Sequence, residues 1–221
     1  MTPRLAVFDC DGTLVDGQVS ICEAMEAGFA AADLPPPDRH DIRRIVGLSL
    51  PQAVAILAPE ARHHQVTKTV QGYKDHFRLS RTEGRLQEPL YDGIAALLDT
   101  LRADGWRLAV ATGKSDRGLV SCLATHGLSD HFVSLQTADR HPSKPDPAML
   151  HAAMGEAGVA PDRTVMIGDT TFDMIMARAA DVAALGVDWG YHASAELMAE
   201  GARQVCSTAH ELSDALSAIV R

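Results

Sequence analysis

Residues 5–13 read LAVFDCDGT, a short apolar run that ends in two aspartates one residue apart. Four apolar residues followed by turn chemistry predict a buried β-strand over residues 5–8. Asp9 and Asp11 then lie at the carboxyl end of that strand, where two carboxylates can share one hard cation and Gly12 permits a sharp turn. The alternative is a strand-ending Asx-Gly turn with a spare carboxylate. As a functional pair, the two aspartates would supply a nucleophile and an acid/base.

Five more short runs of β-type sequence follow, and helical patterns separate them. They are Leu108–Ala111, Phe132–Leu135, Val165–Ile167, Val182–Leu185 and Gln204–Cys206. A chain that alternates strands and helices in this way forms βαβ units and a parallel sheet. The sequence therefore predicts an α/β fold.

The segment between the first two predicted strands is helical in pattern and too long for a simple crossover. One apolar helical face repeats at Val66, Val70, Tyr73 and Phe77. Turn-forming residues lie at both ends of the segment, where the chain would leave and rejoin the sheet. We therefore expect a core domain formed by residues 1–15 and 88–221, and an inserted helical domain at residues 16–87.

The composition excludes several classes of protein. With 221 residues, 46% hydrophobic and 22% charged, the chain can bury a sizeable core, which argues against disorder. A net charge of −9 would repel polyanions, so no nucleic-acid partner is expected. The four cysteines form no C-x-x-C pair, and the apolar start is too short for a signal peptide. We expect a reduced, cytoplasmic protein with no membrane partner.

Two other segments offer groups that suit a phosphate. A predicted strand ends in VATGK at residues 110–114, where the Thr112 hydroxyl and the Gly113 amide can hold phosphate oxygens. The alternative for Thr112 is an ordinary cap or sheet-end hydroxyl. Lys144, within SKPDP at residues 143–147, presents a cation that suits a phosphate or a carboxylate. The alternative for Lys144 is a surface lysine.

A second acidic pair follows another predicted strand. The run VMIGDTTFD at residues 165–173 places Asp169 at the strand end and Asp173 four residues on, on the same side of a starting helix. The alternative is a helix cap and a first-turn aspartate favoured by the helix dipole. Because parallel strands open on one edge, where ligands bind, we expect both acids to face the Asp9 strand end.

Taken in order, these motifs resemble those of the haloacid dehalogenase (HAD) superfamily. The matching positions are Asp9-x-Asp11-Gly12-Thr13, Thr112, Lys144 and Gly168-Asp169-x-x-x-Asp173. The presence of Asp11 favours the phosphatase branch over the dehalogenases, which lack this second acid, and the chain is similar to phosphoglycolate-phosphatase-like members. The resemblance implies a Rossmann-like parallel sheet core with helices on both faces, plus an inserted α-helical cap domain.

The resemblance also implies catalytic roles. Asp9 would attack phosphorus to form an aspartyl-phosphate, and Asp11 would protonate the leaving oxygen and then activate water. Thr112 and the Gly113 amide would bind the transferring phosphoryl group, while Lys144 would balance its charge and that of Asp9.

The same resemblance implies Mg²⁺ as the cofactor. Its ligands would be Asp9, the main-chain carbonyl of Asp11, and Asp169. Asp173 would orient the waters of the metal rather than bind it directly. The partner expected from these roles is a small phosphorylated metabolite, with 2-phosphoglycolate as the first candidate.

The cap would set substrate choice by closing over the site. Arg44 and Gly47 belong to the segment that we expect to contact substrate, because a cation beside a flexible turn can meet a carboxylate or a second phosphate. A solvated cationic helix face is the alternative. The same core residues would also serve a phosphomutase of the β-phosphoglucomutase type, and a non-catalytic phosphometabolite-binding regulatory module is a further alternative. The expected state is a monomer or homodimer.

Overall fold

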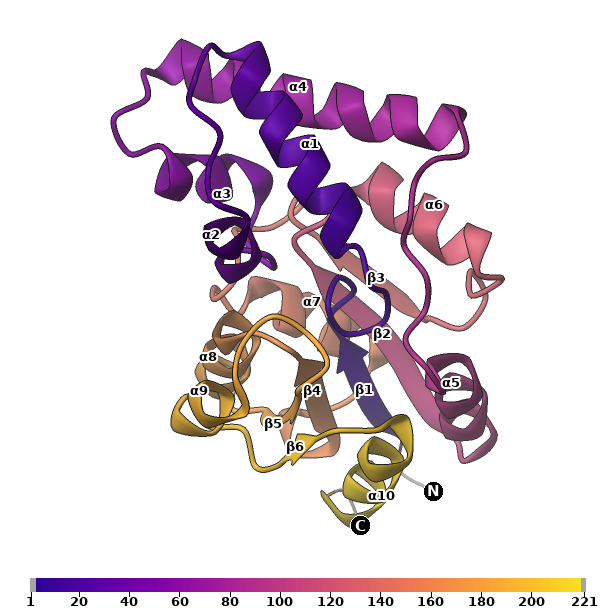
Figure 1. Ribbon diagram of the computed structural model, residues 1–221. Helices are drawn as coiled ribbons and strands as arrows, with labels where there is room; N and C mark the ends of the chain where they lie inside the picture. The colour runs from indigo at the N-terminus through magenta and orange to yellow at the C-terminus, as the bar shows by residue number, and fades with distance from the viewer. Residues whose placement is uncertain (1–2, 220–221) are drawn as a thin grey trace.

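The computed structural model describes residues 3–219, and its centre is a six-stranded parallel β-sheet (Figure 1). The strands are β1 (Arg4–Phe8), β2 (Trp106–Thr112), β3 (Ser134–Thr137), β4 (Thr164–Gly168), β5 (Ala183–Val187) and β6 (Val205–Cys206). They lie in the order β3-β2-β1-β4-β5-β6, and every pair of neighbours is parallel. All six predicted strands are confirmed, although β3 begins two residues later than the apolar run suggested.

Helices cover both faces of the sheet because successive residues of a strand point to opposite sides. In β1, Ala6 and Phe8 pack in one apolar cluster, whereas Leu5 and Val7 pack in another. The first face is covered by α5 (Ile94–Ala103), α6 (Asp116–Thr125) and α10 (Ala209–Ile219). The second is covered by α7 (Ala148–Ala157), α8 (Thr171–Ala179) and α9 (Ser194–Ala199). The predicted Rossmann-like α/β fold is confirmed.

The strand order places β1 at the centre of the sheet. The chain builds outward from β1 through β2 and β3, and then returns to the other side of β1 with β4. The crevice outside the carboxyl ends of β1 and β4 is therefore a topological switch point, where ligands bind in such sheets. Phe8, the last residue of β1, pairs with Val110 of β2 and Ile167 of β4. The residues that follow these three positions consequently meet at one edge.

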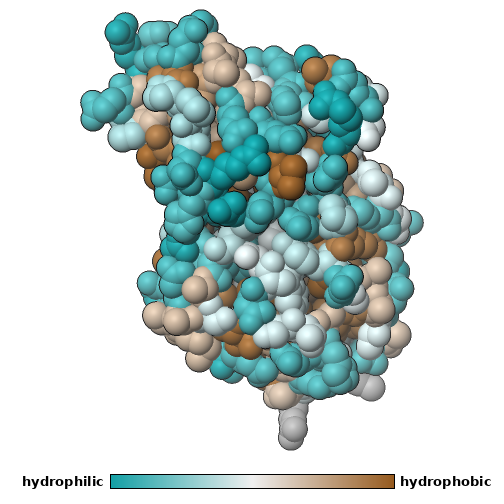
Figure 2. Space-filling view, in the orientation of Figure 1, coloured by the Kyte–Doolittle hydropathy of each residue, from teal (hydrophilic) through white to brown (hydrophobic). Residues whose placement is uncertain are grey.

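Five helices intervene between β1 and β2, and the first four form the upper part of the molecule in Figure 1. These four are α1 (Gln18–Ala31), α2 (Arg39–Arg44), α3 (Leu50–Leu57) and α4 (His63–Thr82). Helices α1 and α4 lie side by side, and Tyr73 and Phe77 of α4 pack against an apolar cluster that includes Met25, Phe29 and Ile42. Figure 2 shows a mostly hydrophilic surface over these helices, with small apolar spots between.

The chain enters and leaves the four helices along two adjacent backbone segments. Asp16 N donates a hydrogen bond to Pro89 O at 2.8 Å, and Val15 forms an isolated antiparallel bridge with Leu90. The two connections therefore form a narrow neck between these helices and the sheet. The division into domains at residues 16–87 stays a prediction.

Two further features concern the whole chain. All four cysteines are buried and unpaired, so no disulfide crosslinks the fold. Among residues 3–219, no helix is both long enough and apolar enough to cross a membrane. The cytoplasmic location stays a prediction.

Candidate active site

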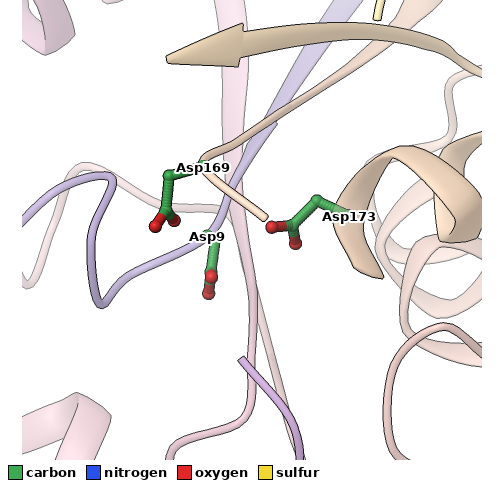
Figure 3. Close-up of side chains that lie close together, drawn as sticks. All are labelled: Asp9, Asp169 and Asp173. Atoms are coloured by element: carbon green, nitrogen blue, oxygen red, sulfur yellow. The ribbon is translucent and has the colours of Figure 1, made fainter. Parts of the chain in front are cut away.

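Three carboxylates converge at the edge of the sheet where β1 and β4 end (Figure 3). Asp9 follows β1 directly, Asp169 follows β4, and Asp173 lies in the first turn of α8. Asp9 N donates to Ile167 O at 2.9 Å, which continues the pairing of the two strands and sets the two acids side by side. One oxygen from each carboxylate lies within 4.8 Å of the others, and all three residues are fully buried.

A buried lysine joins two of these carboxylates. Lys144 Nζ lies 2.9 Å from Asp9 Oδ1 and 2.6 Å from Asp173 Oδ1, and its side chain has no exposed surface. The surface-lysine alternative is therefore wrong. Burial alone would lower the pKa of Lys144, but the carboxylates of Asp173 and Asp9 raise it above its usual value. Three carboxylates around one ammonium leave two negative charges without a partner.

The pKa values of Asp9 and Asp169 are both raised in this cluster. Burial raises the pKa of Asp9 to about 7, although the Lys144 ammonium opposes the shift. Burial also raises the pKa of Asp169 well above its usual range, and the charges of Asp9 and Asp173 add to the effect. A divalent cation placed among the three carboxylates would compensate both missing charges.

The donor atoms at this point suit a hard cation. Asp9 Oδ2 is buried and has no hydrogen-bond partner among the described residues, whereas Asp9 Oδ1 accepts from Cys10 N at 2.6 Å. Asp169 is held by Thr13 Oγ1 at 3.0 Å and by Tyr191 N at 2.9 Å, each on a different oxygen. All the donors are oxygen atoms, which Mg²⁺ prefers. The residues present therefore fit a magnesium ion.

Backbone conformation helps to keep this space open. Gly12 has a φ of +85°, a value that favours glycine, and a Cβ at this position would overlap the Asp169 carboxylate. The turn after β1 therefore requires glycine both for its conformation and for its close approach to Asp169.

Asp173 serves the helix as well as the site. Its Oδ2 accepts from Thr170 Oγ1 at 2.6 Å and from Thr170 N at 3.2 Å, which closes a capping box at the start of α8. Its Oδ1 is the atom that contacts Lys144. The helix-start alternative is therefore correct for Asp173, and its carboxylate also lies with those of Asp9 and Asp169.

The Asp11 side chain lies in a second cluster. Asp11 Oδ1 is 2.9 Å from Lys114 Nζ, which is also 2.5 Å from Glu88 Oε1. All three side chains are about nine-tenths buried. Burial raises the pKa of Asp11, and the Lys114 ammonium opposes this shift. Burial would lower the pKa of Lys114, but Asp11 and Glu88 raise it overall.

Sequence reasoning missed the roles of Lys114 and Glu88. Lys114 follows Gly113, so the sequence places it at the end of β2. Its partners Asp11 and Glu88 lie in segments far apart along the chain, and the sequence does not predict that they meet. Glu88 lies in the returning connection, where nothing in the local pattern distinguishes it from a solvent-exposed acid. The fold, rather than any motif, brings the two together.

A pocket of about 700 Å³ lies between the four helices and the sheet, and Asp11, Thr112, Gly113 and Gly47 all line it. Thr112 is buried, and its hydroxyl oxygen accepts from Lys114 N at 3.2 Å. A Cβ at Gly113 would overlap the carbonyl groups of Gly47 and the following residue, so the loop after α2 presses directly on the end of β2. The pocket therefore joins the predicted phosphate-binding residues to the inserted helices.

Arg44 lies elsewhere. Its guanidinium makes a bidentate ion pair with Glu196 of α9, at 2.8 Å and 2.7 Å, and it is not among the described residues that line the pocket. The Arg44 carbonyl accepts from His192 Nε2 at 3.1 Å, while His192 Nδ1 accepts from Thr171 N. In this arrangement Arg44 joins the inserted helices to the core.

Comparison with known proteins agrees with this geometry. Residues 6–187 match the family described as Haloacid dehalogenase-like hydrolase. The chain is 35% identical over 223 residues to "Probable phosphatase IndB" of Dickeya dadantii (strain 3937), covering 98% of this chain and 95% of that one. It is 31% identical over 192 residues to "Phosphoglycolate phosphatase" of Agrobacterium fabrum (strain C58), and this match covers 85% of this chain and 81% of that one.

A solved structure shares the whole fold. The crystal structure of "a predicted phosphatase from Clostridium acetobutylicum" superposes with a TM-score of 0.87 at 26% sequence identity. The match covers 98% of this chain and 99% of that one, so it includes the four inserted helices as well as the sheet.

Proposed function

The chain belongs to the haloacid dehalogenase-like hydrolases and is a phosphatase, and from this premise we propose that it uses Asp9 as a nucleophile and Mg²⁺ as a cofactor. The observation that carries the proposal is the buried group of Asp9, Asp169 and Asp173, which is two positive charges short of neutrality with Lys144 in place. Its substrate is a small phosphorylated metabolite. The first candidate is 2-phosphoglycolate, because relatives of this chain bear the name phosphoglycolate phosphatase.

The reaction divides between the two carboxylate clusters. A carboxylate oxygen of Asp9 attacks phosphorus, the bond to the ester oxygen breaks, and that oxygen receives a proton from Asp11. Water then attacks the aspartyl-phosphate at phosphorus and gives its proton to Asp11, which releases phosphate and restores both acids. The raised pKa of Asp11 supports its role, since an acid catalyst must hold a proton near neutral pH.

The remaining residues position charge. Asp9, Asp169, the main-chain carbonyl of Asp11 and, in a supporting role, Asp173 would hold Mg²⁺, which when bound neutralises the carboxylates and the phosphoryl oxygens. The Thr112 hydroxyl and the Gly113 amide would donate to those oxygens, because both groups line the pocket beside Asp11. The Lys144 ammonium orients Asp9 and opposes the burial that raises the pKa of its carboxyl group.

Phosphate release with Mg²⁺, measured over a panel of phosphomonoesters that includes 2-phosphoglycolate, tests the proposal. We expect turnover by the wild type and a loss of at least ~1,000-fold in Asp9→Asn, because the isosteric amide cannot act as the nucleophile. Asp33→Asn is the matched control: Asp33 is an exposed aspartate with a φ of 57°, which asparagine tolerates. Full activity in Asp9→Asn would overturn the assignment. A phosphomutase would instead return the phosphoryl group to an organic product.

A further inference from the structure

The pocket extends well beyond the residues assigned to the reaction. Its volume of about 700 Å³ falls in the range of sites that bury a drug-sized ligand, and a two-carbon ester fills only a small part of it. The lining includes Asp11, Thr112 and Gly113 of the core as well as several side chains of α4. The volume that a two-carbon ester leaves free therefore implies that the α4 side chains contact another part of the substrate.

We propose that Lys74, Arg78 and Arg81 of α4 bind a second anionic group at the far end of an elongated phosphomonoester whose middle part is apolar or aromatic. This inference rests on the proposed phosphatase function and names the substrate class of the same site. The expected distal group is a carboxylate or a second phosphate.

The three cations share one face of their helix. Lys74, Arg78 and Arg81 follow the spacing i, i+4, i+7, which aligns side chains along one side of an α-helix, and all three line the pocket. Lys68 lies on the same helix, is exposed, and is outside the pocket lining. The cationic face is thus directed at the pocket rather than spread around the helix.

The pocket lining is positive in a chain of net charge −9. With Lys114 and with Arg117 of α6 the lining has five cations, and its three acids, Asp11, Asp75 and Asp139, do not balance them. Asp75 is half-exposed and pairs with Arg78 at 2.9 Å, while Asp139 accepts from the Asp116 amide. Surface pairs of this kind are weak and leave a cation available to a ligand.

One donor in this group lacks a partner. Arg81 Nε is buried and has no hydrogen-bond partner among the described residues. A buried guanidinium nitrogen without an acceptor costs free energy, which a carboxylate or phosphate oxygen on a ligand would recover.

Two aromatic residues lie among the three cations of α4 and also line the pocket. Tyr73 and Phe77 stack with ring centroids 5.1 Å apart, and the Phe77 ring centroid lies 5.7 Å from Lys114 Nζ, which contacts Asp11. Arg81 follows Phe77 by one turn of α4, about 6 Å along the helix axis. Aromatic and cationic side chains of α4 therefore share one pocket with Lys114 and Asp11. A ligand that fills this pocket would present its ester oxygen, an apolar segment and its second anion in that order.

Aryl phosphates test this order directly. The probes are 4-carboxyphenyl phosphate and its neutral isostere 4-carbamoylphenyl phosphate, compared by kcat/KM in the wild type. The amide is the more electron-withdrawing substituent, so leaving-group chemistry alone favours the neutral ester. We expect instead at least a tenfold preference for the carboxylate. The double variant Arg78→Gln/Arg81→Gln should reduce this preference to within about twofold, mainly through a lower kcat/KM for the carboxylate ester.

Two further variants separate charge from structure. Lys68→Gln, on the same helix but outside the pocket, should keep the full preference, and Arg81→Lys should keep most of it because the charge remains. Equal kcat/KM for the two esters in the wild type, or a preference that survives in the double variant, would overturn the inference.

Failure of the proposed phosphatase function is distinguishable from failure of the anion site. If the wild type hydrolyses no phosphomonoester, the phosphatase proposal fails, and the α4 site is then tested by binding alone. Calorimetric titration of Asp9→Asn with the two esters should still give a dissociation constant at least tenfold lower for the carboxylate. Equal dissociation constants would reject the anion site whatever the fate of the reaction.

Discussion

Two buried lysines, Lys144 and Lys114, each lie among carboxylates, but their clusters differ in the charge that they leave without a partner. Lys144 lies among three carboxylates at the sheet edge, so two negative charges remain. Lys114 lies between Asp11 and Glu88, so one remains. Two charges suit a divalent cation, whereas one suits a proton. This difference supports the proposal that Asp9 and Asp169 hold a metal ion while Asp11 acts as the acid/base.

The clusters also differ in what builds them. The Lys144 cluster depends on the core alone, because β1, β4, the start of α8 and the loop before α7 supply its members. The Lys114 cluster includes Glu88 from the connection to the inserted helices, and Phe77 of α4 lies 5.7 Å from its ammonium. The inserted helices therefore act on the Asp11 cluster directly, whereas they reach the Lys144 cluster through neighbours such as Ser143, whose Oγ accepts from Ser49 N at 2.7 Å.

The largest expected effect comes from Lys144→Met. This change leaves three buried carboxylates with no cation, and we expect a loss of about 4 kcal/mol in the free energy of unfolding without metal. Urea denaturation with a chelator present measures it, and Mg²⁺ should restore part of the loss. Lys68→Met, an exposed lysine, should change stability by less than about 0.5 kcal/mol. A loss below about 1 kcal/mol in Lys144→Met would show that the Lys144 ammonium does not stabilise these carboxylates.

A smaller loss is expected from Lys114→Met. Two carboxylates, rather than three, lose their cation, so we expect a decrease of about 3 kcal/mol in the free energy of unfolding. The variant should also hydrolyse esters with poor leaving groups disproportionately slowly, because these need a proton from a correctly placed Asp11. The ratio of kcat/KM for nitrophenyl phosphates to kcat/KM for alkyl phosphates, compared between wild type and variant, measures this effect. A uniform decrease over both classes would mean that Lys114 does not act through Asp11.

The smallest effect concerns Glu196, whose pair with Arg44 joins the inserted helices to α9. Arg44 and the Ala193 amide lower the pKa of Glu196 to about 2. Because the folded pKa lies below the unfolded value of about 4.3, the pair stabilises the fold above that value and loses its effect as the pH falls toward 2. The side chain is 41% exposed, so the contribution is below about 1 kcal/mol.

Unfolding of wild type and Glu196→Gln at several pH values from 3 to 7 measures this contribution. The difference between the two proteins should be constant between pH 6 and 7 and should shrink below pH 4.5. A difference that grows on acidification would have the wrong sign for a carboxylate paired with an arginine.

The sequence predicts more of the core than of the pocket. Each strand is a compact apolar run, and the acids after β1 and β4 are predicted from their position to meet, because parallel strands end at one edge. The partners of long side chains are harder to predict. Nothing in the sequence around Lys144 indicates that it is buried. Arg44 is predicted to contact substrate, but it pairs with Glu196, 152 residues away. Such partners depend on how separate elements pack, which local periodicity does not encode.

The central claim is that Asp9 carries the phosphoryl group, and one measurement tests it directly. Asp11→Asn is mixed with radiolabelled 4-nitrophenyl phosphate and Mg²⁺, quenched in acid and digested. Nitrophenolate leaves without a proton, so the first step survives, while water attack lacks its base and the intermediate accumulates. The account predicts label on the peptide that contains Asp9, with none in Asp9→Asn. Label on another residue, or phosphate release at the wild-type rate with Asp9 unlabelled, would contradict it.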